Sequence, residues 1–194
     1  METLPVDFYL NNDTATIARN LLGKILIHET ERGQVGGMIV ETEAYLGQND
    51  PASHSYRGKT PRNSCMFGPP GTGYIYISYG IHHCFNVVCQ PHGVGEAVLI
   101  RALEPLMGLD IMAANRKGKP LEQLTNGPGK LCQALGIDLS LNGHDLTQPP
   151  LYLLPGKTPH AVGTSARIGI SVGQELPLRF YVKGNRYVSR SPRN

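Results

Sequence analysis

The sequence predicts an α+β fold in a single domain, and its length, its glycine and proline content and its short β-like runs predict it. A chain of 194 residues can bury a full core, and one domain over 1–194 fits this length. The 23 glycines and 15 prolines favour many turns and short strands over a helical bundle. We therefore expect strands flanked by a few helices, with residues 186–194 forming a basic, flexible end.

One helix and one hairpin are predicted before residue 43. Asp13 has the side chain of a helix N-cap and Gly23 is typical of a helix end, so a helix is expected over 14–22. Two β-like runs then follow around a short turn, which is typical of a hairpin. The expected strands are 24–29 and 35–42, with the turn at 31–33.

A long loop and three strands are predicted in the middle of the chain. Between 49 and 72 the composition shifts to Pro, Gly, Ser, Asn and basic residues, and long ordered loops in compact domains are usually functional. Arg101 interrupts the last of the apolar runs that follow, and a buried arginine requires a partner. The expected strands are 74–79, 84–90 and 97–103.

Two helices and two closing strands complete the predicted elements. Pro105 is typical of a helix start, and apolar residues at helical spacing predict a helix over 106–116. The segment 126–130 leads into a helix at 131–135, whose first amides, with Lys130 beside them, either hold a phosphate or form a plain turn. The remaining expectations are a loop over 142–155 with an apolar run at 151–154, and closing strands at 166–172 and 178–182.

The net charge of +3 does not by itself indicate a nucleic-acid partner. Basic residues gather at the C-terminal end, where no carboxylate follows Glu175. A solvated basic tail is the interpretation that these residues alone favour. They are Arg179, Lys183, Arg186, Arg190 and Arg193.

The cysteines and the N-terminal residues indicate the compartment. Cys65, Cys84, Cys89 and Cys132 form no CxxC pair, and no basic, apolar leader follows Met1. Reduced thiols are therefore expected. Since no apolar run approaches the roughly 20 residues of a membrane-spanning helix, we expect a soluble cytoplasmic protein without a signal peptide or a transmembrane segment.

Glu41 and Glu43 are the main candidates for acid–base chemistry. Residues two apart on a strand share a face, so both carboxylates and Tyr45 lie together if the strand extends that far. Like charges held close raise one pKa, which suits a general base. The alternative is the end of a half-exposed strand whose carboxylates face water.

Three other kinds of site find no support in the sequence. A P-loop would need GK[ST] and a helix after 71–73, and neither is found. Zinc is disfavoured because His82 and His83 point to opposite faces of a strand and no HExxH or zinc-deaminase pattern occurs. No serine has a GxSxG setting and no cysteine an evident histidine and acid. We therefore expect no metal, no cofactor and no covalent nucleophile.

The tyrosines beside the basic loop indicate nucleic-acid binding. Strand alternation puts Tyr76 on one face and Tyr79 on the other, so one can line a pocket while the other is displayed outward. Stacking on a base requires aromatic rings, and a phosphate backbone requires nearby cations. The alternative is a tyrosine-rich strand packed within a sheet, which the sequence periodicity alone favours.

Ordered motifs run through nearly the whole chain, from LLGK at 21–24 to RFYVKG at 179–184. Between them lie VETEAYLG at 40–47, His54-Ser55, TPRN at 60–63, PGTGYIYISYGIHHCFN at 70–86, LIRALEP at 99–105 and NGPGKLCQAL at 126–135. Together these segments resemble the alkyladenine type of 3-methyladenine DNA glycosylase. The resemblance implies a curved, mostly antiparallel β-sheet surrounded by helices, with a protruding β-hairpin that enters DNA.

The resemblance also implies a role for each matching residue. Glu43 matches the general base that activates water, Arg101 a group that helps to hold that water, and Ile168 supplies a backbone carbonyl as its third partner. The base pocket would have Tyr45 and His54 on one wall, Tyr76 on the opposite wall, Asn86 as the screen against guanine, and Tyr79 as the wedge that enters the duplex.

Contacts to the DNA backbone are expected from Arg57, Lys59, Arg62 and Lys130. The basic loop is shorter than is typical of the family, and the turn at 91–96 is longer. No lysine lies at the matched catalytic positions, so the resemblance implies a monofunctional glycosylase that does not cleave the strand. We expect a monomer that acts on damaged purines in double-stranded DNA in the bacterial cytoplasm, at the nucleoid.

Two rival functions remain at this stage. A non-catalytic nucleic-acid-binding protein would use the tyrosine-rich strand as a stacking platform and release no base. A hydrolase of free nucleosides would not require duplex DNA. The residues do not rank 3-methyladenine, 7-methylguanine, hypoxanthine and ethenoadenine as substrates.

Overall fold

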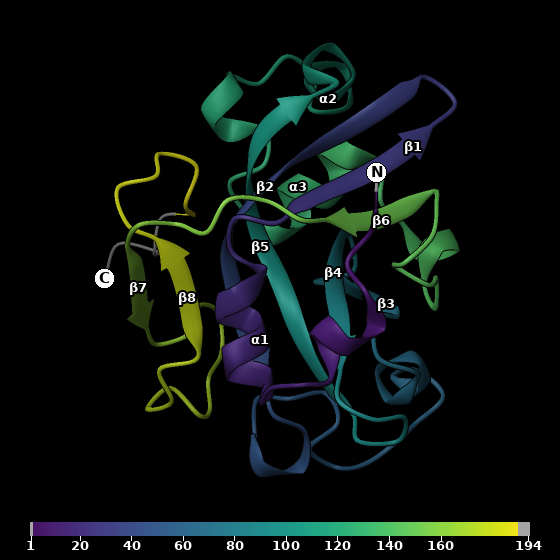
Figure 1. Ribbon diagram of the computed structural model, residues 1–194, viewed down its shortest axis with the longest axis vertical. Coiled ribbons are helices and arrows are strands. Elements are labelled where there is room, and N and C mark those ends of the chain that lie inside the picture. The colour runs from purple at the N-terminus through teal and green to yellow at the C-terminus, as the bar shows by residue number, and fades with distance from the viewer. Residues whose placement is uncertain (1, 190–194) are drawn as a thin grey trace.

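The computed structural model describes residues 2–189, whose strands form one sheet of eight (Figure 1). The order is β3-β4-β5-β2-β1-β6, with β8 beside β2 and β7 beside β8, and the named pairs are antiparallel. The expected α+β class with a curved antiparallel sheet is confirmed. The strands are β1 (Ile25–Thr30), β2 (Gly33–Tyr45), β3 (Gly73–Ser78), β4 (His82–Cys89), β5 (Glu96–Met107), β6 (Leu151–Leu154), β7 (Val162–Ser165) and β8 (Arg179–Val182).

Strand β2 lies at the centre of the sheet. One edge of β2 pairs with β5. The other edge pairs first with β1, from Gly33 to Met38, and then with β8, from Glu41 to Glu43. This change of partner places both glutamates where β2 runs between β5 and β8.

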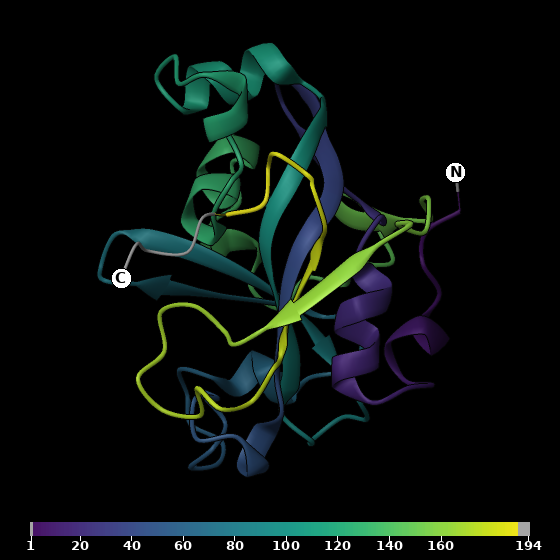
Figure 2. The same ribbon diagram turned by 90° about the vertical axis from the view of Figure 1, so that its left-hand side faces the viewer.

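Three α-helices pack on the sheet within residues 2–189, namely α1 (Thr14–Leu21), α2 (Leu109–Asn115) and α3 (Pro128–Leu135). Figure 2 shows α1 and α3 on either side of the central strands β2 and β5. As predicted, Asp13 caps α1, since its carboxylate accepts a hydrogen bond from the Thr16 amide at 2.9 Å. Gly136 ends α3 in the left-handed conformation, with a φ of 70°.

Shorter 3₁₀ turns join these elements. They are η1 (Val6–Tyr9), η2 (Gly47–Asn49), η3 (Ser64–Phe67), η4 (Leu121–Gln123) and η5 (Leu139–Leu141). None of the helices that the structure describes is both long enough and apolar enough to cross a membrane.

Two of the four clusters of buried apolar side chains in the described residues support the helices and the tyrosines on the sheet. The larger one joins α1, the sheet and α3 through residues such as Ile17, Ile100 and Leu131, which are fully buried. Each side chain of this kind contributes about 1.5–3 kcal/mol when it leaves water. The rings of Tyr45 and Tyr76 pack against a smaller cluster, whose members are Met66, Phe67, Tyr74, Val88 and Ala97.

Strand β5 continues through Pro105, so the prediction that a helix starts there is wrong. Pro105 pairs with Gly37 beside an irregularity in the β2–β5 ladder. Proline is tolerated at such a position because it cannot donate to a regular ladder. Helix α2 begins only at Leu109, after Gly108 turns the chain with a φ of 68°.

The C-terminal half departs from the sequence prediction in two places. Residues 166–172 form a loop and not a closing strand, because the strand lies earlier, at Val162–Ser165. Within this loop Gly169 has a φ of 77°, which an extended strand does not allow. The apolar run at 151–154, expected within a loop, is strand β6 and pairs with β1.

Gly37→Ala is expected to destabilise the fold by about 1–3 kcal/mol. A Cβ on Gly37 would lie 2.5 Å from the carbonyl oxygen of Glu104, so backbone of β2 or β5 would have to move. Thermal denaturation measures this loss. Gly58→Ala is the control, because a Cβ there meets nothing within 4 Å and only its φ of 90° strains alanine. Equal losses in the two variants would contradict the role of close approach at Gly37.

Candidate active site

Two glutamates on β2 are fully buried at the point where the strand pairs with β5. Glu41 and Glu43 have no exposed surface, so the alternative in which these carboxylates face water is wrong. The ladder is irregular around Glu41, and Arg101 is the residue left out of the pairing on β5. Such a bulge re-aims a side chain. Arg101 contacts both carboxylates, with Nε 3.0 Å from Glu41 Oε1 and Nη1 3.2 Å from Glu43 Oε2.

Glu43 receives hydrogen bonds from three parts of the fold. The Ile168 amide, in the loop after β7, donates to Oε1 at 2.7 Å. The Tyr45 hydroxyl, two residues along β2, donates to Oε2 at 3.0 Å, and Arg101 from β5 donates to the same oxygen. The carboxylate therefore has a fixed orientation.

Burial raises the pKa of Glu43 above its ordinary value. The Arg101 charge, the Ile168 amide and the Tyr45 hydroxyl lower this pKa in part, and the Glu41 charge adds a smaller increase. The sequence predicted a raised pKa for one of the two carboxylates. The main cause is desolvation, however, and not repulsion between them. A carboxylate that is desolvated in this way is a stronger base than one in water.

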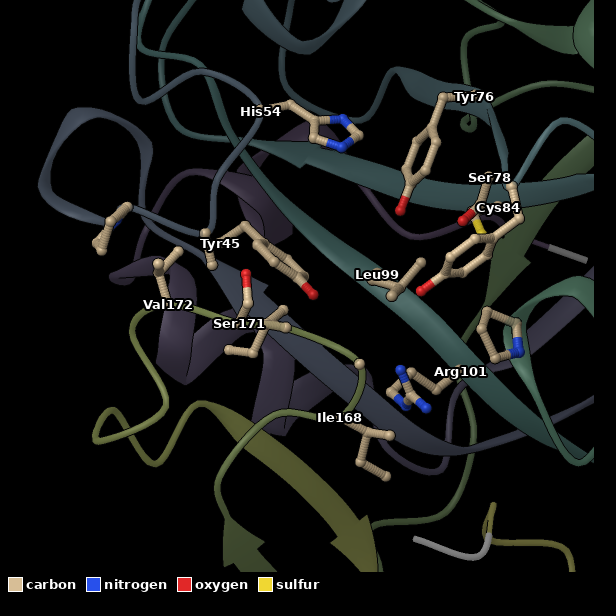
Figure 3. Close-up of a pocket in the computed structure, with 16 residues that line it drawn as sticks. Tyr45, His54, Tyr76, Ser78, Cys84, Leu99, Arg101, Ile168, Ser171 and Val172 are labelled. Carbon is tan, nitrogen blue, oxygen red and sulfur yellow. The ribbon is translucent and has the colours of Figure 1, made fainter. Parts of the chain in front are cut away.

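A cavity of about 460 Å³ lies beside the groups that bind this carboxylate (Figure 3). Glu43 itself does not line the cavity, but all three of its hydrogen-bond donors do. Figure 3 shows the rings of Tyr45 and Tyr76 reaching the cavity from β2 and β3, with Arg101 and Ile168 at its lower end. A planar aromatic molecule entering this space would lie directly over the donors of Glu43.

The ring of His54 lies against that of Tyr76 and lines the same cavity as Tyr45 and Tyr76. The two ring centroids are 4.4 Å apart in an edge-on arrangement, and His54 Nδ1 is 2.9 Å from the Tyr74 hydroxyl. Burial lowers the pKa of His54, which favours the neutral imidazole. Asn86 donates from Nδ2 to the carbonyl of Tyr74 at 3.0 Å and borders a small recess that also touches Tyr45, His54 and Tyr76.

Tyr79 stands at the tip of the β3–β4 hairpin, and 87% of its surface is exposed. Its φ of 49° is unusual for a residue other than glycine, and Gly80 follows with a φ of 75°. Ile77 and Ile81 on either side are also exposed. In Figure 2 the hairpin projects from the same side as the loop between β7 and β8, which carries Ile168.

The basic residues named from the sequence fall into two groups. Arg57 and Lys59 are exposed in the loop between β2 and β3. Arg62 is tied to the hairpin, since its Nη2 donates to the Ile77 carbonyl at 3.4 Å. Lys130, on the first turn of α3, donates from Nζ to Asn126 at 2.8 Å and lines a second cavity beside Tyr79, of about 440 Å³.

The C-terminal segment is not a uniformly solvated tail, so that interpretation is wrong for its first part. Arg179 is buried on β8 and pairs with Glu41 at 2.7 Å. Ser189 is buried as well, and its amide and hydroxyl donate to Glu41 at 2.6 and 2.8 Å. Arg186 is exposed. Of the end expected to be flexible, 190–194 lie outside the described residues.

Sequence reasoning also missed a buried pair beside the pocket. Arg167 forms a two-pronged salt bridge with Asp50, and its guanidinium lies 4.7 Å from the centroid of the Tyr45 ring. The pair joins the loop after β2 to the loop after β7. Arg179 had a recognisable signal, because it interrupts an apolar run as Arg101 does. Arg167 lies within the strand that the sequence predicted at 166–172, but this segment forms a loop.

None of the described residues forms a group of three or more His, Cys, Asp or Glu side chains with the geometry to hold a metal ion.

Comparison with known proteins identifies the family. The sequence profile of the methylpurine-DNA glycosylase family matches residues 7–186. A protein from Methanoculleus marisnigri, with the name "Putative 3-methyladenine DNA glycosylase", is 52% identical over 97% of this chain and 99% of its own length. Proteins of the same name from Carboxydothermus hydrogenoformans and Desulfitobacterium hafniense are 52% and 48% identical, over 96% and 97% of this chain and 98% and 99% of their own lengths. The chain thus belongs to the methylpurine-DNA glycosylase family.

Proposed function

We propose that the protein releases damaged purines from double-stranded DNA by hydrolysis of the N-glycosidic bond and leaves an abasic site. The observation that carries the proposal is the arrangement of Glu43: a buried carboxylate whose three hydrogen-bond donors all line a tyrosine-walled cavity. Family membership and the names of the relatives support DNA glycosylase activity. The whole chain acts as one domain and as a monomer in this proposal.

The damaged nucleotide must leave the duplex before it can reach Glu43. Extrusion costs a few kcal/mol in lost stacking and pairing, least for a damaged base. Tyr79 offsets part of this cost by filling the vacated space in the stack, as apolar wedges do in other DNA-binding proteins. Arg57, Lys59, Arg62 and Lys130 would hold the phosphates on either side, since they lie around the hairpin or in the neighbouring loop.

The tyrosines provide the binding surface for the extruded base. An alkylated purine with a positive charge gains cation–π attraction between Tyr45 and Tyr76, about 0.5–2 kcal/mol depending on desolvation. A neutral lesion such as hypoxanthine gains no such term. For it, hydrogen bonds from the His54 backbone and steric exclusion of the guanine amino group by Asn86 would supply the discrimination.

Glu43 acts as a general base in the chemical step. The bond between C1′ and the purine nitrogen breaks, the electron pair leaves with the base, and an oxocarbenium-like sugar develops. Water then bonds to C1′ and gives its proton to Glu43, whose charge also stabilises the sugar cation. Arg101 and the Ile168 carbonyl hold this water. Since Tyr45 donates to Glu43 Oε2, the water must compete with the tyrosine hydroxyl for that oxygen.

Base release from a panel of lesion duplexes tests the proposal. Free base should appear from at least one of the duplexes with 3-methyladenine, 7-methylguanine, hypoxanthine or ethenoadenine, and the strand should stay intact because no lysine is proposed to attack the sugar. Binding without release would indicate the non-catalytic alternative. Equal activity on free nucleosides would indicate the nucleoside hydrolase.

The pH dependence of excision should differ between charged and neutral lesions. Glu43 must be ionised to accept a proton, and its pKa is raised, so the rate should fall with falling pH already above the ordinary carboxyl value of about 4.3. A neutral hypoxanthine must be protonated before it leaves, so its rate should also fall as the pH rises. Already cationic 3-methyladenine should show no alkaline fall. Single-turnover rates from about pH 5 to pH 9 measure both profiles. Identical bell-shaped profiles for the charged and the neutral lesion would contradict protonation of the leaving base.

A further inference from the structure

Glu41 is more heavily hydrogen-bonded than the proposed base beside it. It accepts from Arg101 Nε at 3.0 Å, from Arg179 Nε at 2.7 Å, and from the amide and hydroxyl of Ser189 at 2.6 and 2.8 Å. It has no exposed surface, and it does not line the tyrosine-walled cavity. Glu41 therefore acts on the site only through its partners.

The Arg101 guanidinium connects the two carboxylates. Its Nε edge contacts Glu41, and Nη1 at the other end contacts Glu43 at 3.2 Å. Without Glu41, the planar fork of Arg101 would be free to turn toward Glu43 and form a two-pronged pair with it. Such a pair would occupy the carboxylate oxygens that the reaction needs.

The charges of this buried group balance when Glu43 is ionised. Two carboxylates, Glu41 and Glu43, face two guanidinium groups, Arg101 and Arg179. Arg167 is neutralised separately by Asp50. The titratable and charged groups around Glu43 are Arg101 from β5, Tyr45 and Glu41 from β2, Tyr76 from β3, Cys84 from β4 and Arg167 from the loop after β7, with Arg179 from β8 acting through Glu41.

We propose that Glu41 is a positioning residue for the reaction, a proposal that rests on the function proposed above. It holds Arg101 so that only Nη1 reaches Glu43, and it balances the charge of Arg179. The C-terminal segment completes this support through Ser189, which connects the end of the described chain to the catalytic centre.

Four variants separate the two contributions of Glu41. Glu41→Gln keeps the length of the side chain and removes its charge, whereas Glu41→Asp keeps the charge and shortens the reach. Arg179→Gln removes the opposite charge, and the double variant Glu41→Gln/Arg179→Gln restores the balance. Each variant is assayed for single-turnover release of 7-methylguanine as a function of pH. The rates are normalised to the fraction of the protein that binds an abasic-site duplex, which measures how much of it is folded.

Glu41→Gln should slow release by about 100-fold, as expected for a displaced catalytic group, and should move the acid limb of the rate to lower pH by about one unit. The sign follows from the charges, because loss of an anion leaves excess positive charge that favours ionised Glu43. Arg179→Gln should move the limb to higher pH, and the double variant should return it to the wild-type position. Glu41→Asp should slow release without moving the limb.

A purely structural Glu41 would lower the folded fraction but would not move the limb in opposite directions in the two single variants. The proposal would therefore be overturned if the folded variants lost activity at the same acidic pH as the wild-type protein. If Glu41→Gln does not fold, the test is Arg179→Gln alone. Its acid limb of the release rate must move to higher pH for the proposal to hold. Failure of the wild-type protein to release any base would instead overturn the proposed function, so the two failures are distinguishable.

Discussion

Glu43→Gln is expected to lower the single-turnover rate of base release by about 10²–10⁴-fold, the range typical of a removed general base. Glutamine has nearly the same shape, so the cavity is preserved, but an amide neither accepts a proton from water nor stabilises a sugar cation by its charge. Arg101 keeps Glu41 as a partner in this variant. Release of purine from a lesion duplex, followed with enzyme in excess, measures the chemical step directly.

Binding provides the first control for Glu43→Gln. Affinity for a lesion duplex should be retained, because Tyr45, Tyr76 and Tyr79 are unchanged. The matched variant is Glu29→Gln on β1, where the carboxylate accepts hydrogen bonds from Gln34 and Tyr152 and does not border the tyrosine-walled cavity. Its rate should equal that of the wild-type protein. Wild-type release by Glu43→Gln would remove Glu43 from the mechanism.

Tyr79→Ser is expected to weaken binding to an abasic-site duplex by roughly 5- to 150-fold, the equivalent of about 1–3 kcal/mol for the loss of one stacked ring. The ring is 87% exposed and packs on nothing that would be disturbed, so the folded state should keep its stability. Binding of the DNA with the extruded nucleotide should be weakened more than the rate of bond cleavage is lowered. The dissociation constant and the single-turnover rate at saturating enzyme separate the two effects.

Leu106→Ser is the control for loss of an exposed apolar side chain. Leu106 lies on β5 within the irregularity between Pro105 and Met107, borders neither the tyrosine-walled cavity nor the cavity beside Tyr79, and is 49% exposed. Its affinity for the same duplex should not change. Equal affinity of Tyr79→Ser and the wild-type protein would show that the hairpin tip does not enter the stack, and the wedge would then have to be sought elsewhere.

Features set by neighbouring residues could be predicted from the sequence. The cap at Asp13 and the hairpin of β1 and β2 depend on residues a few positions apart, and both are found in the structure. The prediction of a helix start at Pro105 was wrong because a contact with a distant residue decided the local structure. Helical spacing was present, but pairing with Gly37 on a distant strand outweighed it.

The candidate site shows the same division between local and distant contacts. The pairing of Arg101 was foreseeable, because a guanidinium within an apolar strand requires a carboxylate and Glu41 and Glu43 were the obvious candidates. The position of His54 was not, since the contact of its ring with Tyr76 depends on how a long loop folds back on β3.

The sequence by itself determined the family, the α+β class and the identity of the carboxylates and tyrosines, because ordered motifs and local periodicity are properties of the chain alone. Only the tertiary structure decided which groups surround those carboxylates. Arg179 and Ser189 reach Glu41 from 138 and 148 positions away, and Arg167 reaches Asp50 across 117. No local pattern encodes contacts of that range, since they form only when burial forces separate charged groups to find one another.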